Sequence, residues 1–162
     1  MTGLVQPFIS TVPGSLDSKG RVCIPATYRH ILSAQAPQGI QSTAGLYICP
    51  SFIDPALDAF GQTLLDAIHA RLAAQDPFFS VAHDDEATAL IARTQSLPVD
   101  ENGRVRLPEA LIEHAGLKDR IVFVGKAQKF QVWDAQRYAP IEAEALARVK
   151  ARMEKLRGGD AL

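Results

Sequence analysis

Little in this sequence of 162 residues points to a membrane, to secretion or to a disulfide scaffold. No apolar run approaches the about 20 residues that a membrane-spanning helix needs. The first ten residues lack the basic and apolar regions of a signal peptide. The two cysteines, Cys23 and Cys49, lie far apart and form no C-x-x-C motif, which suits a reducing compartment and argues against a zinc knuckle. We therefore expect a cytoplasmic protein with no membrane partner.

An excess of positive charge is also missing, because 17 lysines and arginines face 18 aspartates and glutamates, for a net charge of −1. Isolated nucleic-acid-binding domains are usually basic, so a DNA-binding function would need a local concentration of positive charge. Enzyme signatures are missing too: G-x-S-x-G, a phosphate-binding glycine loop and H-E-x-x-H. Residues 83–86, "HDDE", cannot all face one ion and are interpreted as solvated. We predict no enzyme, no catalytic or metal site, no cofactor and no small-molecule substrate.

The most informative feature that is present is a repeat. The stretch Ser15–Pro25, "SLDSKGRVCIP", returns as Pro98–Pro108, "PVDENGRVRLP", at a constant offset of 83 residues. The length is close to that of one compact domain, and 47% of the residues are apolar. We therefore expect one domain over residues 1–162 that contains two internal repeats, roughly 8–54 and 92–138.

Each copy of the repeat has the composition of a tight turn. An aspartate before such a turn can accept hydrogen bonds from main-chain N–H groups inside it, and a glycine supplies a positive φ without steric cost. We predict one turn formed by Asp17 and Gly20 and a second formed by Asp100 and Gly103. An ordinary hairpin turn with an Asp–Arg pair would explain the aspartate and the glycine.

The arginine that follows glycine in both copies is not needed by a turn. Strand alternation makes four positions point outward: Arg21, Cys23, Arg104 and Arg106. Arginine is favoured where a planar fork of donors must hold phosphate or a guanine edge. A doubled arginine suits a ligand that repeats, of which DNA is the common case. The pattern is suggestive of a DNA contact, and spacing alone does not decide it.

Helix and strand patterns follow each copy of the repeat. Short helices are expected from Pro25 to about Ala34 and from Pro108 to about Ala115, with Gly116 as a C-cap. The expected strands are Gly45–Pro50, Arg120–Gly125 and Lys129–Asp134. Longer helices are expected at roughly 54–74, with Asp54 as N-cap, and at roughly 141–156. Residues 89–99 are compatible with helix, strand or both.

Both turns and their contexts resemble the MraZ family. The matching stretches are "SLDSKGRVCIPATYR", "DENGRVRLPEALIEHAGL", "IVFVG" and "FQVWDAQRY", in the family's order and over most of the chain. The resemblance implies a mainly β fold with helices (α+β), a swapped-hairpin AbrB/SpoVT-like β-barrel formed by two internal repeats in one chain. Residues 30–45 and 49–54 fit loosely, so a first-half strand equivalent to 129–134 is not among the predicted elements.

The resemblance also implies a function. MraZ proteins are bacterial, cytoplasmic, nucleoid-associated regulators that assemble into rings. They bind short tandem repeats in double-stranded DNA, usually as repressors of the division and cell-wall gene cluster. The D-x-x-x-R motifs of the family correspond to Asp17–Arg21 and Asp100–Arg104. We expect Arg21 and Arg104 to reach bases or phosphates, Lys19 and Arg106 to contact phosphates, and the aspartates to hold the turns.

Two further expectations concern surfaces outside the turns. The aromatic residues Phe52, Phe60, Phe78 and Phe79 are interpreted as core or subunit interface, and Trp133 as core. Basic residues of the last helix alternate with glutamates, so that helix is interpreted as solvated or facing a subunit.

The alternative function is a protein–protein scaffold whose ring assembly is the function. Lys19 corresponds to Asn102 in the second turn, so the two turns are expected to contact DNA unequally.

Overall fold

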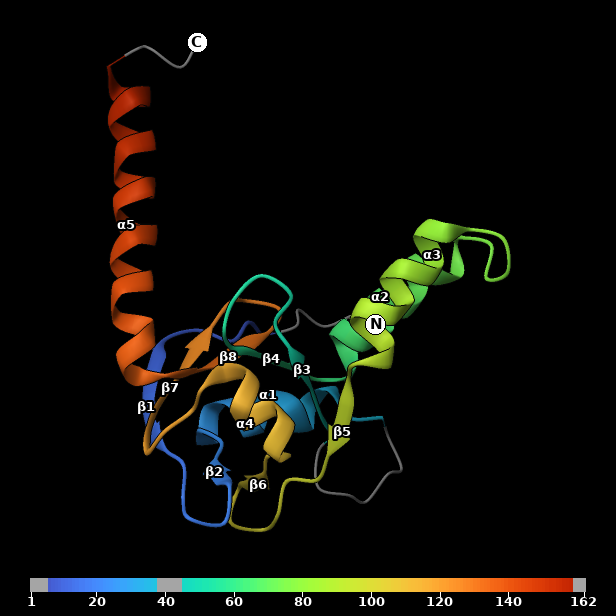
Figure 1. The fold of residues 1–162 in the computed structure, drawn as a ribbon, viewed down its shortest axis with the longest axis horizontal. Helices are drawn as coiled ribbons and strands as arrows, with labels where there is room; N and C mark the ends of the chain where they lie inside the picture. Colours follow the sequence, from blue (N-terminus) through green and yellow to red (C-terminus); the bar gives the residue numbers. More distant parts are fainter. Residues whose placement is uncertain (1–5, 38–44, 159–162) are drawn as a thin grey trace.

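The computed structural model describes residues 6–37 and 45–158 (Figure 1). A six-stranded sheet has the order β1-β7-β8-β4-β3-β5, and a two-stranded sheet pairs β2 with β6. The strands of the large sheet are β1 (Thr11–Ser15), β3 (Leu46–Pro50), β4 (Leu57–Phe60), β5 (Gln95–Leu97), β7 (Arg120–Gly125) and β8 (Phe130–Asp134). The small sheet contains β2 (Arg21–Cys23) and β6 (Arg104–Arg106). All pairings are antiparallel, and with the helices they confirm the predicted α+β class.

The strand order interleaves the two halves of the chain. Strand β1 of the first half pairs with the β7–β8 hairpin, and β5 of the second half pairs with the β3–β4 hairpin. Strands β4 and β8 join these two three-stranded units in the middle of the sheet. In each unit, the edge strand of one half thus pairs with the hairpin of the other. This arrangement agrees with an exchange of strands between two repeats, while closure into a barrel stays a prediction.

The helices of the structure are α1 (Ala26–Gln35), α2 (Gln62–Ala73), α3 (Val81–Glu86), the π-helix η1 (Ala87–Ala92), α4 (Glu109–Ala115) and α5 (Ala135–Arg157). Pro25 and Pro108 are the N-cap residues of α1 and α4. Gly116 ends α4 with a left-handed φ of 57°, which confirms the predicted C-cap. No helix within residues 6–37 and 45–158 is both long enough and apolar enough to cross a membrane.

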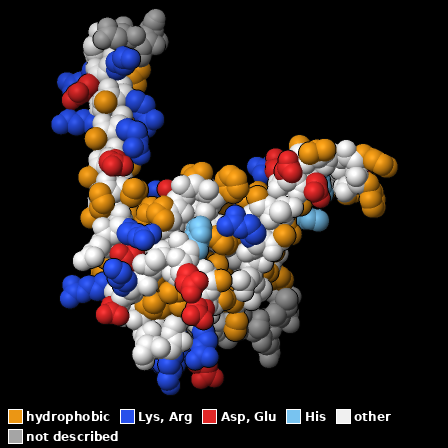
Figure 2. Space-filling view, viewed as in Figure 1, with side chains coloured by type: hydrophobic (Ala, Val, Ile, Leu, Met, Phe, Trp, Pro, Cys, Tyr) orange, Lys and Arg blue, Asp and Glu red, His pale blue; other side chains and the backbone are white. Residues whose placement is uncertain are grey.

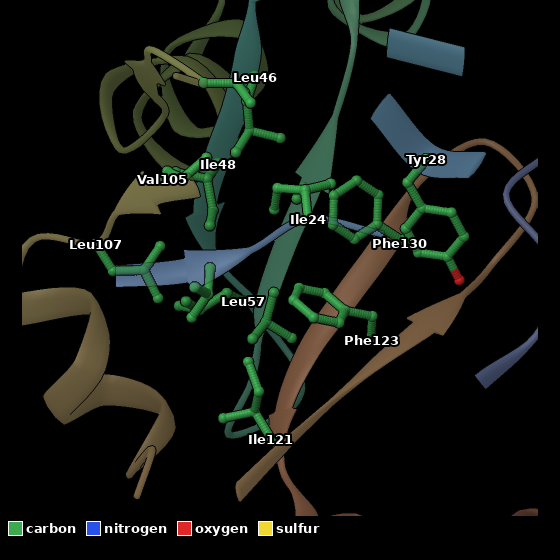
Figure 3. Packing of buried hydrophobic residues seen from close by; sticks show 14 of the residues in the cluster. Ile24, Tyr28, Leu46, Ile48, Leu57, Val105, Leu107, Ile121, Phe123 and Phe130 are labelled. Atoms are coloured by element: carbon green, nitrogen blue, oxygen red, sulfur yellow. The ribbon is translucent and has the colours of Figure 1, made fainter. Parts of the chain in front are cut away.

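The main core lies between the large sheet, helices α1 and α4, and the two-stranded sheet (Figure 3). Its centre is aromatic: the ring of Tyr28 on α1 lies 5.3 Å from that of Phe8 and 4.8 Å from that of Phe130 on β8, centre to centre. The Tyr28 hydroxyl is satisfied by the main-chain carbonyl of Ile9, at 2.8 Å. Burial of these rings fixes α1 against the sheet.

A second, smaller core attaches the first turns of α5 to the other side of the sheet. It contains Trp133, which is 1% exposed, with Tyr138 and Ile141 of α5 packed against it. The indole N–H donates to the Gln131 side-chain oxygen at 2.8 Å, so Trp133 is a core residue, as predicted. Beyond these first turns α5 extends away from the body of the protein (Figure 1).

The helix predicted at 54–74 is wrong in its first part. Residues 57–60 form β4, which pairs with β3 and β8, and α2 begins only at Gln62. Leu57 and Phe60 match the helical stripe but are buried as strand residues. The first half therefore contains a second hairpin strand that was not predicted. Pairing on both edges outweighed the local helical signal.

Three other expectations are settled by the structure. Helix α5 begins at Ala135, six residues before the expected 141, because the Asp134 carboxylate accepts the Arg137 N–H and caps it. The open segment 89–99 contains helix and then strand, as η1 followed by β5. Of the four phenylalanines interpreted as core or subunit interface, Phe60 is buried, whereas Phe52, Phe78 and Phe79 are 76–88% exposed and are not core residues.

Candidate nucleic-acid interface

The two copies of the repeated turn lie beside each other because β2 and β6 pair with each other. The register aligns Arg21 with Arg106, Val22 with Val105, and Cys23 with Arg104. The two valines are each 1% exposed and close the core. The other four positions form the opposite face of this two-stranded ribbon, which therefore presents three arginines and Cys23. Side chains directly opposite each other on one face have Cβ atoms about 4.5–5.5 Å apart.

Each turn extends this ribbon through its glycine. The Ile24 N–H donates to the Gly103 carbonyl, and the Leu107 N–H donates to the Gly20 carbonyl, both at 2.8 Å. The two glycines have φ values of +78° and +80°, which confirms the positive φ expected for both. These two reciprocal bonds join the turns directly and fix their positions relative to each other, although the turns lie far apart in the sequence.

The first turn is held by the Asp17 carboxylate. One of its oxygens accepts the N–H of Arg21 at 2.8 Å and that of Lys19 at 2.9 Å. Its other oxygen accepts the Arg21 Nε–H at 2.8 Å. The hydrogen bond from the Arg21 main chain holds the pKa of Asp17 below its ordinary value, with the Arg21 side chain acting in the same direction.

The second turn repeats the main-chain part of this arrangement and omits the side-chain part. The Asp100 carboxylate accepts the N–H of Asn102 at 2.8 Å and that of Arg104 at 2.9 Å. The Arg104 N–H bond lowers the pKa of Asp100. Among the described residues, no side-chain ion pair links Asp100 to Arg104. Both aspartates therefore accept main-chain hydrogen bonds that close their turns.

The ribbon face is unequal at its two ends. One end carries Arg21 opposite Arg106, and the other carries Arg104 opposite Cys23. The Arg21 guanidinium is held by Asp17, whereas Arg104 and Arg106 are exposed strand residues. Lys19 adds a charge at the first turn and has the neutral Asn102 as its counterpart. The predicted cluster of Lys19, Arg21, Arg104 and Arg106 is thus brought to one edge of the molecule (Figure 1).

Acidic side chains also lie at this edge. Asp17 and Asp100 lie within the turns, and the exposed Glu101 is also part of the second turn. Figure 2 shows basic side chains at this lower edge with acidic ones beside them. Positive and negative side chains are therefore interleaved at this edge. Because salt screens exposed charges, the arginines on the ribbon face attract an anion mainly at close approach.

Sequence reasoning missed Arg29, which supports the second turn from α1. Its Nε donates to the Ile24 carbonyl at 3.1 Å, and its side chain covers Gly103 so closely that an added Cβ would lie 2.6 Å from Nε. The equivalent position 83 residues later is Ile112, whose Cδ1 covers Gly20 at 3.4 Å from such a Cβ. The repeat offset marks the position, but only the fold shows that it faces the opposite turn.

The arrangement has a clear chemical capacity. A two-stranded antiparallel ribbon is narrow enough to enter the major groove of B-form DNA. Three guanidinium groups on one face offer planar donor pairs for phosphate oxygens or guanine edges. Among the described residues, no group of three or more metal-ligating side chains comes together, and residues 83–86 end the short helix α3.

A family model and several similar curated sequences all point to one family. Residues 90–157 match the family model described as "MraZ protein, putative antitoxin-like". The chain is similar to the transcriptional regulator MraZ of Azorhizobium caulinodans, with 40% identity over 94% of this chain and 92% of the relative. The protein of the same name from Xanthobacter autotrophicus is 39% identical over 88% of this chain and 87% of the relative. The one from Parvibaculum lavamentivorans is 37% identical over 97% of this chain and 94% of the relative.

Proposed function

This chain belongs to the MraZ family, and from that premise we propose that it is a sequence-specific, double-stranded-DNA-binding transcriptional regulator and not an enzyme. The observation that carries the proposal is the pairing of β2 with β6. This pairing gathers Arg21, Arg104 and Arg106 on one face of a ribbon. The second turn is closed by main-chain N–H groups donating to Asp100, so no bond within that turn uses the Arg104 side chain.

The roles of the residues follow from what already holds them. Arg104 donates no side-chain bond to Asp100, so its whole guanidinium is available for a base edge or a phosphate. Arg21 uses its Nε–H for Asp17 and keeps its remaining N–H donors for DNA. Lys19 and Arg106 are proposed phosphate contacts. A carboxylate is repelled by phosphate, so Asp17 and Asp100 act by ordering the turns.

Self-assembly compensates for the modest charge of one subunit. With a net charge of −1, a single chain has little overall attraction for DNA, so its local basic surfaces, such as the ribbon face, must supply it. A ring that engages successive tandem repeats makes each later contact intramolecular, which raises apparent affinity by about 10²–10⁴-fold. We therefore propose a ring-forming repressor of the division and cell-wall gene cluster that binds tandem repeats upstream and is cytoplasmic and nucleoid-associated.

The test is fluorescence anisotropy with a duplex taken from upstream of the gene that encodes this chain, measured across a salt series. Arg104→Ala should weaken binding by about 1–3 kcal/mol and reduce the slope of log K against log salt by about 0.9 if a phosphate contact is lost. Arg21→Ala should do the same to a different extent, and the double variant should bind most weakly.

A matched control is Lys126→Ala, which removes an exposed lysine from the β7–β8 turn. Its salt slope should equal that of the unaltered protein, and light scattering should show that every variant keeps its assembly state. Unchanged binding in the Arg21→Ala/Arg104→Ala double variant would refute the proposed DNA contact.

The scaffold alternative predicts a different pattern. If the arginines only build turns or subunit contacts, their removal should break assembly first and alter DNA binding only as a consequence. The repressor assignment has its own readout, since added protein should reduce transcription in vitro from a promoter that overlaps the bound repeats. An increase in transcript would reverse the proposed sign of regulation.

A further inference from the structure

Helix α5 carries an apolar face that nothing in the described residues covers. Beyond Ile141, the exposed apolar residues are Leu146 (63%), Val149 (41%), Met153 (55%) and Leu156 (54%). Their spacing of three, four and three residues places them in one line along the helix, as in the seam of a helix pair. We name these four residues the α5 seam. A line of this kind on a projecting helix marks a protein-contact surface.

A second apolar surface lies at the end of the arm, residues 62–92, formed by α2, α3 and η1. Phe78, Phe79 and Val81 at its tip are 86%, 88% and 74% exposed. The tip is ordered, because Asp76 accepts the N–H groups of both phenylalanines, at 2.8 and 3.2 Å. An ion pair of 3.0 Å between Arg71 and Glu86 ties α2 to α3. The aromatic rings are therefore presented by a defined hairpin.

The charges around these two surfaces are opposite. Residues 146–157 contain five basic residues and one acidic residue, and Lys150 and Arg152 flank the seam directly. Residues 76–86 contain four acidic residues and no lysine or arginine. Two copies of α5 would bring like charges together along the seam, which disfavours self-pairing of this helix. The acidic arm tip of a second copy provides both the apolar side chains and the complementary charge.

The positions of the two surfaces suit a head-to-tail contact. Figure 1 shows α5 and the arm at opposite ends of the body, both directed away from the edge that carries β2 and β6. Figure 2 shows apolar side chains at the end of the arm, and apolar and basic side chains along α5. A contact between different surfaces of identical chains propagates from chain to chain and forms a ring if it closes.

We propose that the arm tip of one protomer binds the α5 seam of the next copy of this chain. The inference rests on the self-assembly in the proposed function and names the surfaces that form it. The β2–β6 ribbons of successive protomers stay exposed on the same side of such an assembly. Arginines from several chains then face one DNA duplex, which is the geometry that tandem repeats require.

The test uses charge reversal at exposed positions, followed by sedimentation velocity and light scattering of the full chain. The arm variant is Asp84→Lys/Asp85→Lys, and the helix variant is Lys150→Glu/Arg152→Glu. Each alone should sediment as a single chain, and the chain with all four substitutions should assemble again because the complementarity is restored in reverse. Glu113→Lys on α4 is the control and should leave the assembly unchanged. Circular dichroism verifies that every variant is folded.

The outcomes separate this contact from the proposed function. If the unaltered protein assembles and both reversal variants still do, the arm–α5 contact is wrong while assembly stands. If the unaltered protein is a single chain at micromolar concentration, the contact and the ring both fail. Binding to a duplex with one repeat is an independent measure: the single-chain variants should keep this affinity within about twofold and lose the about 10²–10⁴-fold gain on tandem repeats. Loss of single-repeat binding in every form would instead refute the DNA-binding function.

Discussion

Replacing the two turn glycines by alanine should have unequal effects on stability, although their backbones are nearly identical. Gly20 and Gly103 have φ values of +78° and +80°. The left-handed strain of an alanine at either position therefore contributes the same cost, about 1–2 kcal/mol. Gly20→Ala serves as the matched control for Gly103→Ala, because the backbone term cancels in the comparison.

The difference between the two variants comes from the neighbour above each turn. At Gly20 the nearest atom to a new Cβ is Ile112 Cδ1 at 3.4 Å, which is close to an ordinary contact. At Gly103 the Cβ would lie 2.6 Å from Arg29 Nε, so the Arg29 side chain must move. That movement breaks its 3.1 Å hydrogen bond to the Ile24 carbonyl, which costs about 0.5–1.5 kcal/mol. Gly103→Ala should thus lower the free energy of unfolding by about 1.5–3.5 kcal/mol, the sum of the backbone strain and the lost hydrogen bond.

Urea unfolding at a fixed protomer concentration measures both free energies, and a third variant isolates the cause. In an Arg29→Ala background, the Gly103→Ala penalty should fall to that of Gly20→Ala, since the clash and the hydrogen bond are both gone. Equal penalties for the two glycine variants in the unaltered background would refute the reasoning. They would show that Arg29 moves aside at no cost.

Three further outcomes follow from the core and the turns. Phe130→Ala should lower the free energy of unfolding by about 3–5 kcal/mol in denaturant titration, because this ring is 0% exposed at the centre of the aromatic cluster; a loss below about 1 kcal/mol would contradict its place in the core. Tyr28→Phe should cost about 1–2 kcal/mol in the same assay, as its buried hydroxyl donates to main-chain carbonyls. The pKa values of Asp17 and Asp100 are lowered in the folded protein, so their stabilisation is present above their ordinary value of 3.8 and is lost as pH falls through the lower folded values. An Asp17→Asn/Asp100→Asn variant should therefore lose less stability between about pH 4 and about pH 2, as followed by thermal unfolding.

Elements that depend on local chemistry could be predicted from the sequence. The two Asp–Gly turns, the C-cap at Gly116 and the strand 120–125 form as expected, because each is specified by residues within a few positions of one another. Residues 54–61 were mistaken for helix because Leu57 and Phe60 have helical spacing. Their strand conformation depends on β3 and β8, and no local pattern reports those partners.

Two equivalent turns, each with an aspartate, a positive-φ glycine and an arginine, follow from local residues alone. That these two turns lie beside each other depends on long-range strand pairing. The pairing of β2 with β6 puts Val22 opposite Val105, which lies 83 positions later in the sequence. Arg29 crosses from one half to support the turn of the other. Local hydrogen bonds fix a turn within five residues, whereas a face of arginines requires the burial of Val22 and Val105 in one shared core.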